Sequence, residues 1–361
     1  MSARDDEAWL FVAEWFDPMP RLKRMFLLKY FVQQRQVEMV DVKSKKMYLK
    51  KSPCPAELTA DDFAVGRKIL LYSRELDLVD YGDLKTKQKL QHQHQQTVVL
   101  LGPDVYTHWG TIVDSLNEKL NLVAMKTIYP PQDVAERLCQ LANISNNRNN
   151  VDALSKGVSL VMILSGVDAP ETAIDVLKSA APSAGPASSV IAAQNGMQVS
   201  ELADLVFHGT SSKAVPNSST LDCCTCCVIK PHAVKSRSTG RILDMIIQAG
   251  YEVSALVTMT LDKSQAEEFL EVYKDVVPDY TDHVVQMSAG MSVALELRAE
   301  DAVRVFRETA GPWDVEIAKE LRPQSIRGAF GETNVRSAVH CTDLPTDGAS
   351  ECEYCFRIMQ G

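Results

Sequence analysis

An internal repetition in the last two thirds of the chain constrains its fold more than any other feature. Leu101-Gly102-Pro103-Asp104 and Ile229-Lys230-Pro231-His232 each end an apolar run with a proline turn. Two histidines, His208 and His340, fall at matching positions later in the two copies. Both copies carry alternating strand-like and helix-like segments, an order that suits a ferredoxin-like sheet. We therefore expect an α+β protein with two tandem ferredoxin-like domains.

Hydrophobic periodicity places the elements of each copy. In the first copy we expect strands at 97–101, 122–129 and 158–164, helices at 109–120, 131–142 and 171–180, and an Asn-rich loop at 143–152. In the second copy we expect strands ending at 229 and at 251–261, 292–298 and 352–359, and helices at 240–250, 264–277 and 300–309. The helix at 264–277 is expected to begin with a capping box at Ser264.

The last strand of the second copy has no counterpart in the first. Residues 209–222 are rich in Ser, Thr, Lys and Pro and contain no strand-like run. An unpaired sheet edge invites association with another strand. We therefore expect the second copy or another protein to cover this edge.

The residues before the repeats read as a separate small β module. Aromatic and alternating runs at 8–15, 26–31, 37–42, 47–49, 69–72 and 76–83 predict short strands. Residues 84–96 are rich in Lys, Gln and His and are expected to be a polar linker, with His92 and His94 solvated rather than bound to a metal. The expected domains are 1–94, 95–220 and 221–361.

Composition indicates the kind of cellular compartment in which the chain folds. The chain has 361 residues, 45% of them hydrophobic and 24% charged, which is ordinary for a globular protein. No apolar run is long enough to cross a membrane, and the charged start carries no signal peptide, so we expect neither membrane insertion nor secretion. Nine cysteines without a signal then indicate reduced thiols in the cytosol.

The net charge of −9 is unevenly distributed. Residues 1–94 hold 17 of the 38 Lys+Arg and 14 of the 47 Asp+Glu, about +3, which leaves −12 for the remainder. This balance argues against nucleic-acid binding by the bulk of the chain. The basic module either meets an acidic protein surface or carries an unremarkable excess of charge.

The cysteine-rich run Cys223-Cys224-Thr225-Cys226-Cys227 raises the question of a metal site. Adjacent cysteines in a strand point to opposite faces, and no second cluster has the usual zinc spacing. Only the fold could bring Cys341, Cys352 and Cys355 near this run. We therefore expect no protein-bound metal.

A single histidine near the C-terminus is the centre of the chemistry. His340 precedes Thr342 and Asp343, and Glu351 follows eleven residues later. A neutral imidazole can act as a nucleophile, and a carboxylate can fix its tautomer. Lys230 at a strand end, Arg307 and Arg327 add cations that suit phosphate oxygens.

In order and spacing these residues resemble the nucleoside diphosphate kinases. That family has a strand ending in Lys-Pro-Asp, then Arg, then Gly-x-Ile-Arg-Gly, then Asn-x-x-His-Gly-x-Asp with a later Glu. Lys230, Arg307, Arg327, His340, Thr342, Asp343 and Glu351 fall on those positions. Three positions depart from the pattern: His232 replaces the Asp, Ser337 the Asn and Cys341 the Gly.

The whole chain resembles the nucleoside diphosphate kinase seven family of cilia, which joins a DM-ten module to two kinase-like domains. The stretches Ala-Glu-Trp-Phe-Asp-Pro and Asp-Tyr-Gly-Asp carry the resemblance of residues 1–94 to the DM-ten module. This implies a place in the axoneme of the cilium or flagellum, with tubulin and other doublet proteins as partners. Fusion of the two domains makes the ordinary hexamer unexpected.

The resemblance also implies roles for the site residues. His340 would carry the phosphate, oriented by Glu351, with Lys230 beside the β or γ phosphate. The nucleotide site would comprise Lys230, Tyr280, Arg307, Arg327, Ser337 and Thr342. Magnesium would travel with ATP or the nucleoside diphosphate.

Several positions depart from the family's site. Leu270 stands where the family has a tyrosine, and Trp313 where it has a threonine. The aromatic at the base would be Tyr280, with His283 beside it.

The first copy keeps the histidine but loses its cations. Gly102 stands in place of Lys230, Leu205 and Ser212 stand at the Asn and Asp positions, and the segment matching Arg327 has no arginine. His208 is therefore expected to be inert. Two functions remain open: mainly a structural component of ciliary doublet microtubules, or an active nucleoside diphosphate kinase in the second copy alone.

Overall fold

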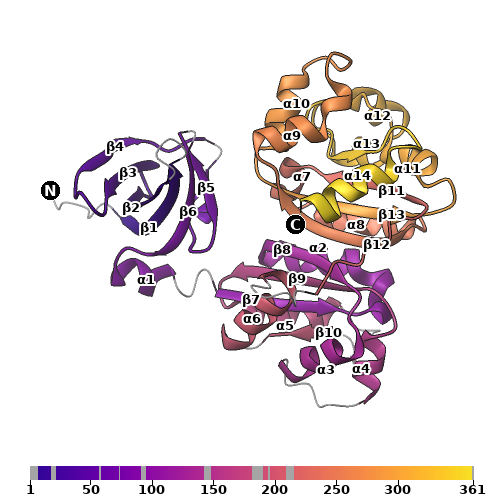
Figure 1. Cartoon of the computed structure of the whole chain (residues 1–361), viewed down its shortest axis with the longest axis horizontal. Coiled ribbons are helices and arrows are strands. Elements are labelled where there is room, and N and C mark those ends of the chain that lie inside the picture. The colour runs from indigo at the N-terminus through magenta and orange to yellow at the C-terminus, as the bar shows by residue number, and fades with distance from the viewer. Residues whose placement is uncertain are drawn as a thin grey trace. The chain divides into compact units, whose positions relative to one another are not determined.

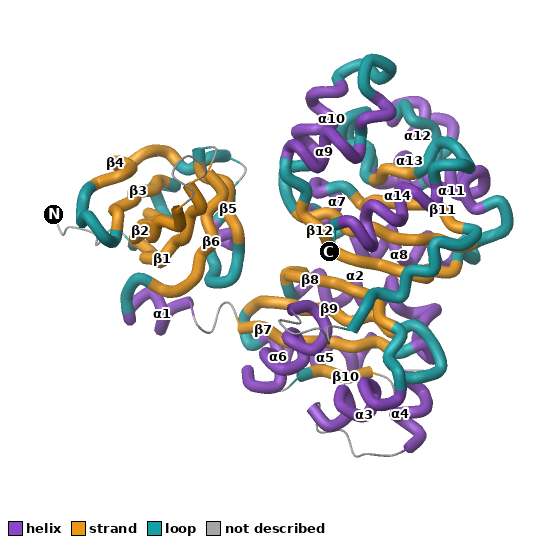
Figure 2. The backbone as a smooth tube through the Cα atoms, viewed as in Figure 1, coloured by secondary structure: helices purple, strands orange, loops and turns teal. Residues whose placement is uncertain are grey.

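The chain forms two compact units, Met1–Gln95 and Gln96–Gly361 (Figures 1 and 2). The structure is a computed structural model, and it describes residues 7–17, 22–56, 58–72, 74–90, 95–141, 148–180, 190–193, 196–208 and 215–359. None of the helices within these ranges has the length and apolar character needed to cross a lipid bilayer.

The N-terminal unit is a six-stranded antiparallel sheet with the order β4-β3-β2-β1-β6-β5. Its strands are β1 (Ala8–Asp17), β2 (Leu22–Phe31), β3 (Gln36–Asp41), β4 (Met47–Pro53), β5 (Lys68–Leu71) and β6 (Arg74–Tyr81). Alternate residues of β1, namely Trp9, Phe11 and Ala13, are buried in its core. The rings of Tyr30 and Phe63 stack there at 4.0 Å. The predicted run of short strands is confirmed.

The first half of the predicted linker is a helix, α1 (Leu84–Leu90). Thr86 and Leu90, four residues apart, are both buried on one face of it. The Thr86 hydroxyl accepts a 3.0 Å hydrogen bond from the backbone N–H of Leu10. The interpretation of 84–96 as linker was wrong here because the intervening lysines hid this narrow buried face. His92 and His94 lie outside the described residues.

The second unit is built on one eight-stranded sheet with the order β10-β7-β9-β8-β12-β13-β11-β14 (Figure 1). Its first-half strands are β7 (Gln95–Leu101), β8 (Asn121–Ile128), β9 (Ser159–Gly166) and β10 (Val190–Ala192). Its second-half strands are β11 (Cys224–Ile229), β12 (Glu252–Thr260), β13 (Met291–Arg298) and β14 (Val339–Cys341). Counted from the outer edge inward, the two halves have the same strand order. The α+β class is confirmed.

Helices connect these strands. The first half carries α2 (Trp109–Lys119), α3 (Gln132–Leu141), α4 (Arg148–Leu154), α5 (Ala169–Ala180) and α6 (Gly196–Ala203). The second half carries α7 (Pro231–Lys235), α8 (Thr239–Gln248), α9 (Lys263–Phe269), α10 (Tyr280–Met287), α11 (Ala302–Ala310), α12 (Val315–Leu321), α13 (Ile326–Phe330) and α14 (Gly348–Glu353).

The halves meet where strand β8 runs beside β12. Here a threonine hydroxyl from each strand accepts a hydrogen bond from a backbone N–H of the other strand, in place of a backbone carbonyl. The hydroxyl of Thr127 accepts from Leu256 N at 2.7 Å, and that of Thr258 accepts from Met125 N at 3.0 Å. This junction makes two four-stranded sheets into a single sheet.

Helices α2 and α8 cross over the same junction without room for a side chain between them. A Cβ on Gly110 would lie 2.3 Å from Asp244 Cα, and a Cβ on Gly240 would lie 2.2 Å from Asp114 N. Glycine and aspartate are four residues apart on both helices, so each helix presents its glycine to the other helix's aspartate. The reciprocal contact relates the two halves by an approximate two-fold axis.

Residues 352–359 are helical, which contradicts the predicted strand. They continue from α14 into a π-helical turn at Tyr354–Ile358. Cys352, Cys355 and Phe356 are buried at helical spacing. Because the run is short, its hydrophobic pattern also fits the two-residue alternation of a strand, so the pattern alone could not distinguish the two. Each half closes its sheet with a three-residue strand instead, β10 or β14. The expectation that the first half's sheet lacks its last strand was therefore wrong.

Two helix boundaries also differ from the prediction. Helix α9 is capped by Asp262, whose carboxylate accepts from Gln265 N, rather than by Ser264, and it ends at Phe269. Both residue pairs fit the capping pattern, and the structure uses the earlier one. Part of the predicted Asn-rich loop is helix α4.

Candidate functional site

His340 lies in the middle of β14, which pairs with β11 at the outer edge of the sheet. Its side chain is only 3% exposed, and its Nε2 lies 2.9 Å from Glu351 Oε2. An ionised carboxylate only accepts, so Nε2 carries the proton and Nδ1 carries the lone pair. Within the described residues Nδ1 makes no hydrogen bond. The arrangement leaves one nucleophilic nitrogen on an oriented ring.

Glu351 is itself held in place from helix α14. The buried Thr342 hydroxyl donates to the same Oε2 at 2.9 Å. Thr342 Oγ1 in turn accepts from the backbone N–H of Cys226 on β11 at 3.0 Å. This chain of hydrogen bonds fixes the carboxylate relative to the strand that carries His340.

Two aromatic rings flank the imidazole edge-on. The centroid of Phe269 lies 4.9 Å from that of His340, and the centroid of Tyr273 lies 6.0 Å away. The Tyr273 hydroxyl donates to Asp343 Oδ2 at 2.8 Å. Leu270, at the position where we expect the family's tyrosine, follows the end of α9, and the next turn brings Tyr273 to the imidazole.

Lys230 follows strand β11 and is almost fully buried at 4% exposure. Its Nζ donates to Val335 O at 3.0 Å and to Ser337 Oγ at 2.9 Å. Burial, together with the nearby charge of Arg327, lowers the pKa of Lys230 to about 7. Ser337 thus contacts the lysine directly, and the lysine has no carboxylate among these partners.

Arg327 is buried against the strand that carries His340. It donates to Gly311 O at 2.9 Å and to Val339 O at 3.4 Å, and its Nε has no hydrogen-bond partner among the residues that the structure describes. Its guanidinium carbon lies 5.5 Å from the centre of the Trp313 ring. The unpartnered Nε gives this cation one donor to offer to an anion.

Arg307, on α11, is half-exposed and is held by Asp343. It donates to the Asp343 backbone oxygen at 2.7 Å and lies 3.3 Å from Asp343 Oδ1. Because the carboxylate also accepts from Tyr273, Asp343 links the arginine to the ring beside His340.

His232 supports the backbone that leads into β14. Its Nε2 accepts from Ala338 N at 3.2 Å, and Ala338 holds a positive φ of 67°. Burial, and then the charge of Lys230, lowers the pKa of His232 to about 4, so the ring stays neutral. The replacement of the family's Asp by His232 therefore stabilises a strained backbone.

Tyr280 shares none of these contacts in the described part of the chain. It begins α10, and its hydroxyl donates to Glu267 O at 3.2 Å. His283, on the same helix, is buried with its ring 5.4 Å from Trp313. The candidates His340, Glu351 and Thr342 form one hydrogen-bonded group, and Lys230 with Ser337 forms another.

The first half offers no cation at the place corresponding to Lys230. Gly102 follows β7 as Lys230 follows β11, and its carbonyl accepts from Trp109 Nε1 at 3.1 Å. Leu205 lies in a π-helical turn at Asp204–His208. Ser212 and the side chain of His208 lie outside the described residues.

Comparison with known proteins agrees with this geometry. The family described as "Nucleoside diphosphate kinase" matches residues 224–360, which contain all eight candidate site residues. "Nucleoside diphosphate kinase homolog 7" of Rattus norvegicus is 34% identical over 381 aligned positions, which cover 98% of this chain and 94% of the rat protein. The chain belongs to the nucleoside diphosphate kinase homolog 7 family.

Two further relatives support the same assignment. The mouse protein of the same name is 33% identical over 380 aligned positions, with 98% of this chain and 94% of the mouse protein covered. "Nucleoside diphosphate kinase" of Aquifex aeolicus is 36% identical over 132 positions, 37% of this chain and 91% of the bacterial protein. The predicted family relationship and the kinase-like C-terminal domain are confirmed.

Proposed function

We propose that the C-terminal half transfers phosphoryl groups between nucleotides through His340. The observation that carries the proposal is the buried His340–Glu351 pair, which leaves Nδ1 as the unbonded nitrogen. In the first step a bond forms from Nδ1 to the γ phosphorus of ATP while the bond from that phosphorus to the β-γ bridging oxygen breaks, releasing ADP. A nucleoside diphosphate then takes the phosphoryl group and restores the free histidine.

The surrounding residues stabilise charge on the transferred group. Lys230 and Arg327 present buried cationic donors, whose interaction with phosphate is strengthened by the low dielectric. Arg307 and Thr342 complete the nucleotide site, and Tyr280 contributes from α10. Magnesium enters with the nucleotide as part of the substrate.

The test is transfer of label from γ-labelled Mg-ATP to a second nucleoside diphosphate by the purified full chain. Kinetics should be ping-pong, because the phosphate rests on the protein between two substrates. Transfer no faster than that of His340→Ala would reject catalysis while leaving a structural role intact.

Nucleotide affinity should depend on pH through Lys230. Its pKa is lowered to about 7 without ligand, and an anionic phosphate should raise it, so binding takes up a proton. The dissociation constant of Mg-ADP should therefore rise between about pH 7.5 and 9, by up to about tenfold per unit.

Calorimetric titration across that range checks the dependence. Lys230→Met should weaken binding and make it independent of pH. Arg307→Gln serves as the matched control, because arginine keeps its proton throughout; its weaker binding should retain the full slope. A slope that persists in Lys230→Met would show that another group takes up the proton.

We also propose a structural role in the axoneme, supported by the loss of cations in the first half. In this proposal residues 1–94 form a DM-ten module, and 95–220 and 221–361 form two tandem kinase-like domains. The paired halves serve as a packing module on ciliary doublet microtubules, with tubulin and other doublet proteins as partners.

Fractionation of cilia tests the structural role. The chain should stay with the axoneme after mild detergent and resist extraction by salt, because large interfaces depend less on screening than surface ion pairs do. Recovery in the soluble matrix would contradict the proposal. His340→Ala should be retained as well as the wild type.

A further inference from the structure

Four cysteines gather on one face of the second half's sheet. Cys224 and Cys226 are two residues apart on β11 and so share a face, while Cys227 points to the opposite side. Helix α14 and the turn after it bring Cys352 and Cys355 against them. Cys224 is 8% exposed and the other three are 0% exposed. The sequence left it to the fold to bring Cys352 and Cys355 near this run, and the structure shows that it does so.

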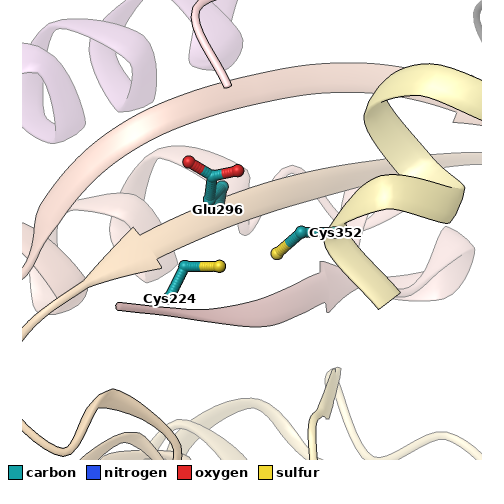
Figure 3. A group of neighbouring side chains, drawn as sticks. All are labelled: Cys224, Glu296 and Cys352. Atoms are coloured by element: carbon teal, nitrogen blue, oxygen red, sulfur yellow. The ribbon is translucent and has the colours of Figure 1, made fainter. Parts of the chain in front are cut away.

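A buried carboxylate from the neighbouring strand completes the group. The ligand atoms of Cys224, Cys352 and Glu296 all lie within 4.8 Å of one another (Figure 3). Cys226 Sγ lies 4.0 Å from Cys355 Sγ. The thiols of Cys224 and Cys226 both lie within side-chain hydrogen-bond reach of the Cys352 thiol. The sulfur atoms therefore form a contiguous set rather than isolated core thiols.

Glu296 retains an acceptor position on one carboxylate oxygen. Its Oε1 accepts from Thr220 N, Thr220 Oγ1 and Ser254 Oγ at 2.9, 3.0 and 2.7 Å. Its Oε2 accepts only from Leu221 N, at 3.2 Å, in the described part of the chain. A carboxylate oxygen has two lone pairs, so Oε2 has capacity for a further partner.

We propose that Cys224, Cys352 and Glu296, with Cys226 as the fourth ligand, bind a structural Zn²⁺ ion. Thiolates with one carboxylate in a tetrahedral set select zinc over the hard cations that accompany nucleotides. Zinc–sulfur bonds of about 2.3 Å place ligand sulfurs about 3.8 Å apart. The ligand atoms of Cys224, Cys352 and Glu296 already approach this spacing, and the Cys226 side chain would turn from Cys355 toward them.

The ion has a route to the site and a structural consequence. Cys224 lines a surface cavity of ≈ 630 Å³ together with Arg298 and Ala349. Cys352 follows Glu351 on α14, and Glu351 orients His340. The ion would therefore link helix α14 to strand β11. Zinc binding is thereby coupled to the stability of the C-terminal half.

The test uses the full chain, without an affinity tag, reduced and stripped of metal under argon. Titration with Co²⁺ should saturate at one equivalent with tetrahedral bands and sulfur-to-cobalt charge-transfer absorption. Zn²⁺ should displace the cobalt and raise the midpoint of thermal unfolding. Failure to bind one equivalent of either ion would overturn the proposal.

Matched variants separate this site from general thiol binding. Cys224→Ala and Cys352→Ala should lose stoichiometric binding and the charge-transfer band. Cys227→Ala, on the opposite face of the same strand and equally buried, should keep both. If Cys352→Ala does not fold, Cys224→Ala at the strand end decides the matter. Unchanged binding in Cys224→Ala, or a Cys226–Cys355 disulfide in the purified protein, would refute the site.

Discussion

Incubation with γ-labelled ATP should leave an acid-labile, alkali-stable phosphate on the wild-type chain and none on His340→Ala. The lability follows from a phosphorus–nitrogen bond to imidazole. The Nδ1 atom of His340 is the unbonded nitrogen of a ring fixed by Glu351, so no second group in the described site can replace it. Labelling after acid and alkali treatment, followed by peptide mapping, measures the effect.

Graded variants distinguish the nucleophile from its support. Glu351→Gln should slow labelling by about 10²-fold without abolishing it, because the ring loses its charged partner but keeps its position. Lys230→Ala and Arg327→Ala should also reduce labelling strongly, since each removes a cation from the transferred group. His208→Ala should label normally. Phosphate that survives in His340→Ala would exclude His340 as the carrier.

The second large effect is expected at the crossing of α2 and α8. Gly110→Ala should lower the free energy of unfolding by about 3 kcal/mol, because the added Cβ would lie 2.3 Å from backbone atoms of the opposite helix. No rotamer change relieves a clash with backbone, so the helices must move apart. Chemical denaturation of the second unit within the full chain, followed by tryptophan fluorescence, measures the loss.

Gly196→Ala is the matched control, since nothing lies within 4 Å of its added Cβ and it begins a helix. It should leave stability unchanged or raise it slightly. Gly240→Ala should resemble Gly110→Ala because the contact is reciprocal. The double variant should cost less than the sum of the singles, since the first substitution already separates the helices. Additive losses would mean that the two contacts are independent.

Much of the secondary structure could be predicted because buried strands and amphipathic helices have distinct periods. Strands β7, β8, β9 and β12, and helices α2 and α8, lie where their hydrophobic patterns placed them. Short segments failed, as at 352–359, where four buried positions fit two periods equally. Such runs are decided by what packs against them, which the local pattern does not contain.

The site divides in a similar way. His340, Glu351 and Thr342 are close in the sequence, so their spacing already indicated a group. Tyr273 reaches the imidazole only because α9 ends early, and the thiols of β11 and α14 meet only through tertiary packing. For this contact the sequence offered one signal, the presence of Tyr273 three residues after Leu270. Neither arrangement follows from linear spacing.

The shared sheet also orders events during synthesis. Strand β8 leaves the ribosome roughly 130 residues before β12, its neighbour across the junction. At typical elongation rates the nascent first half waits on the order of 10 s. During this time the edge of β8 is unpaired, and Gly110 on α2 is not yet covered by α8. During that interval it offers the surface that a second nascent chain of the same protein would fit. Neighbouring ribosomes on one message therefore create the setting in which halves of different chains exchange.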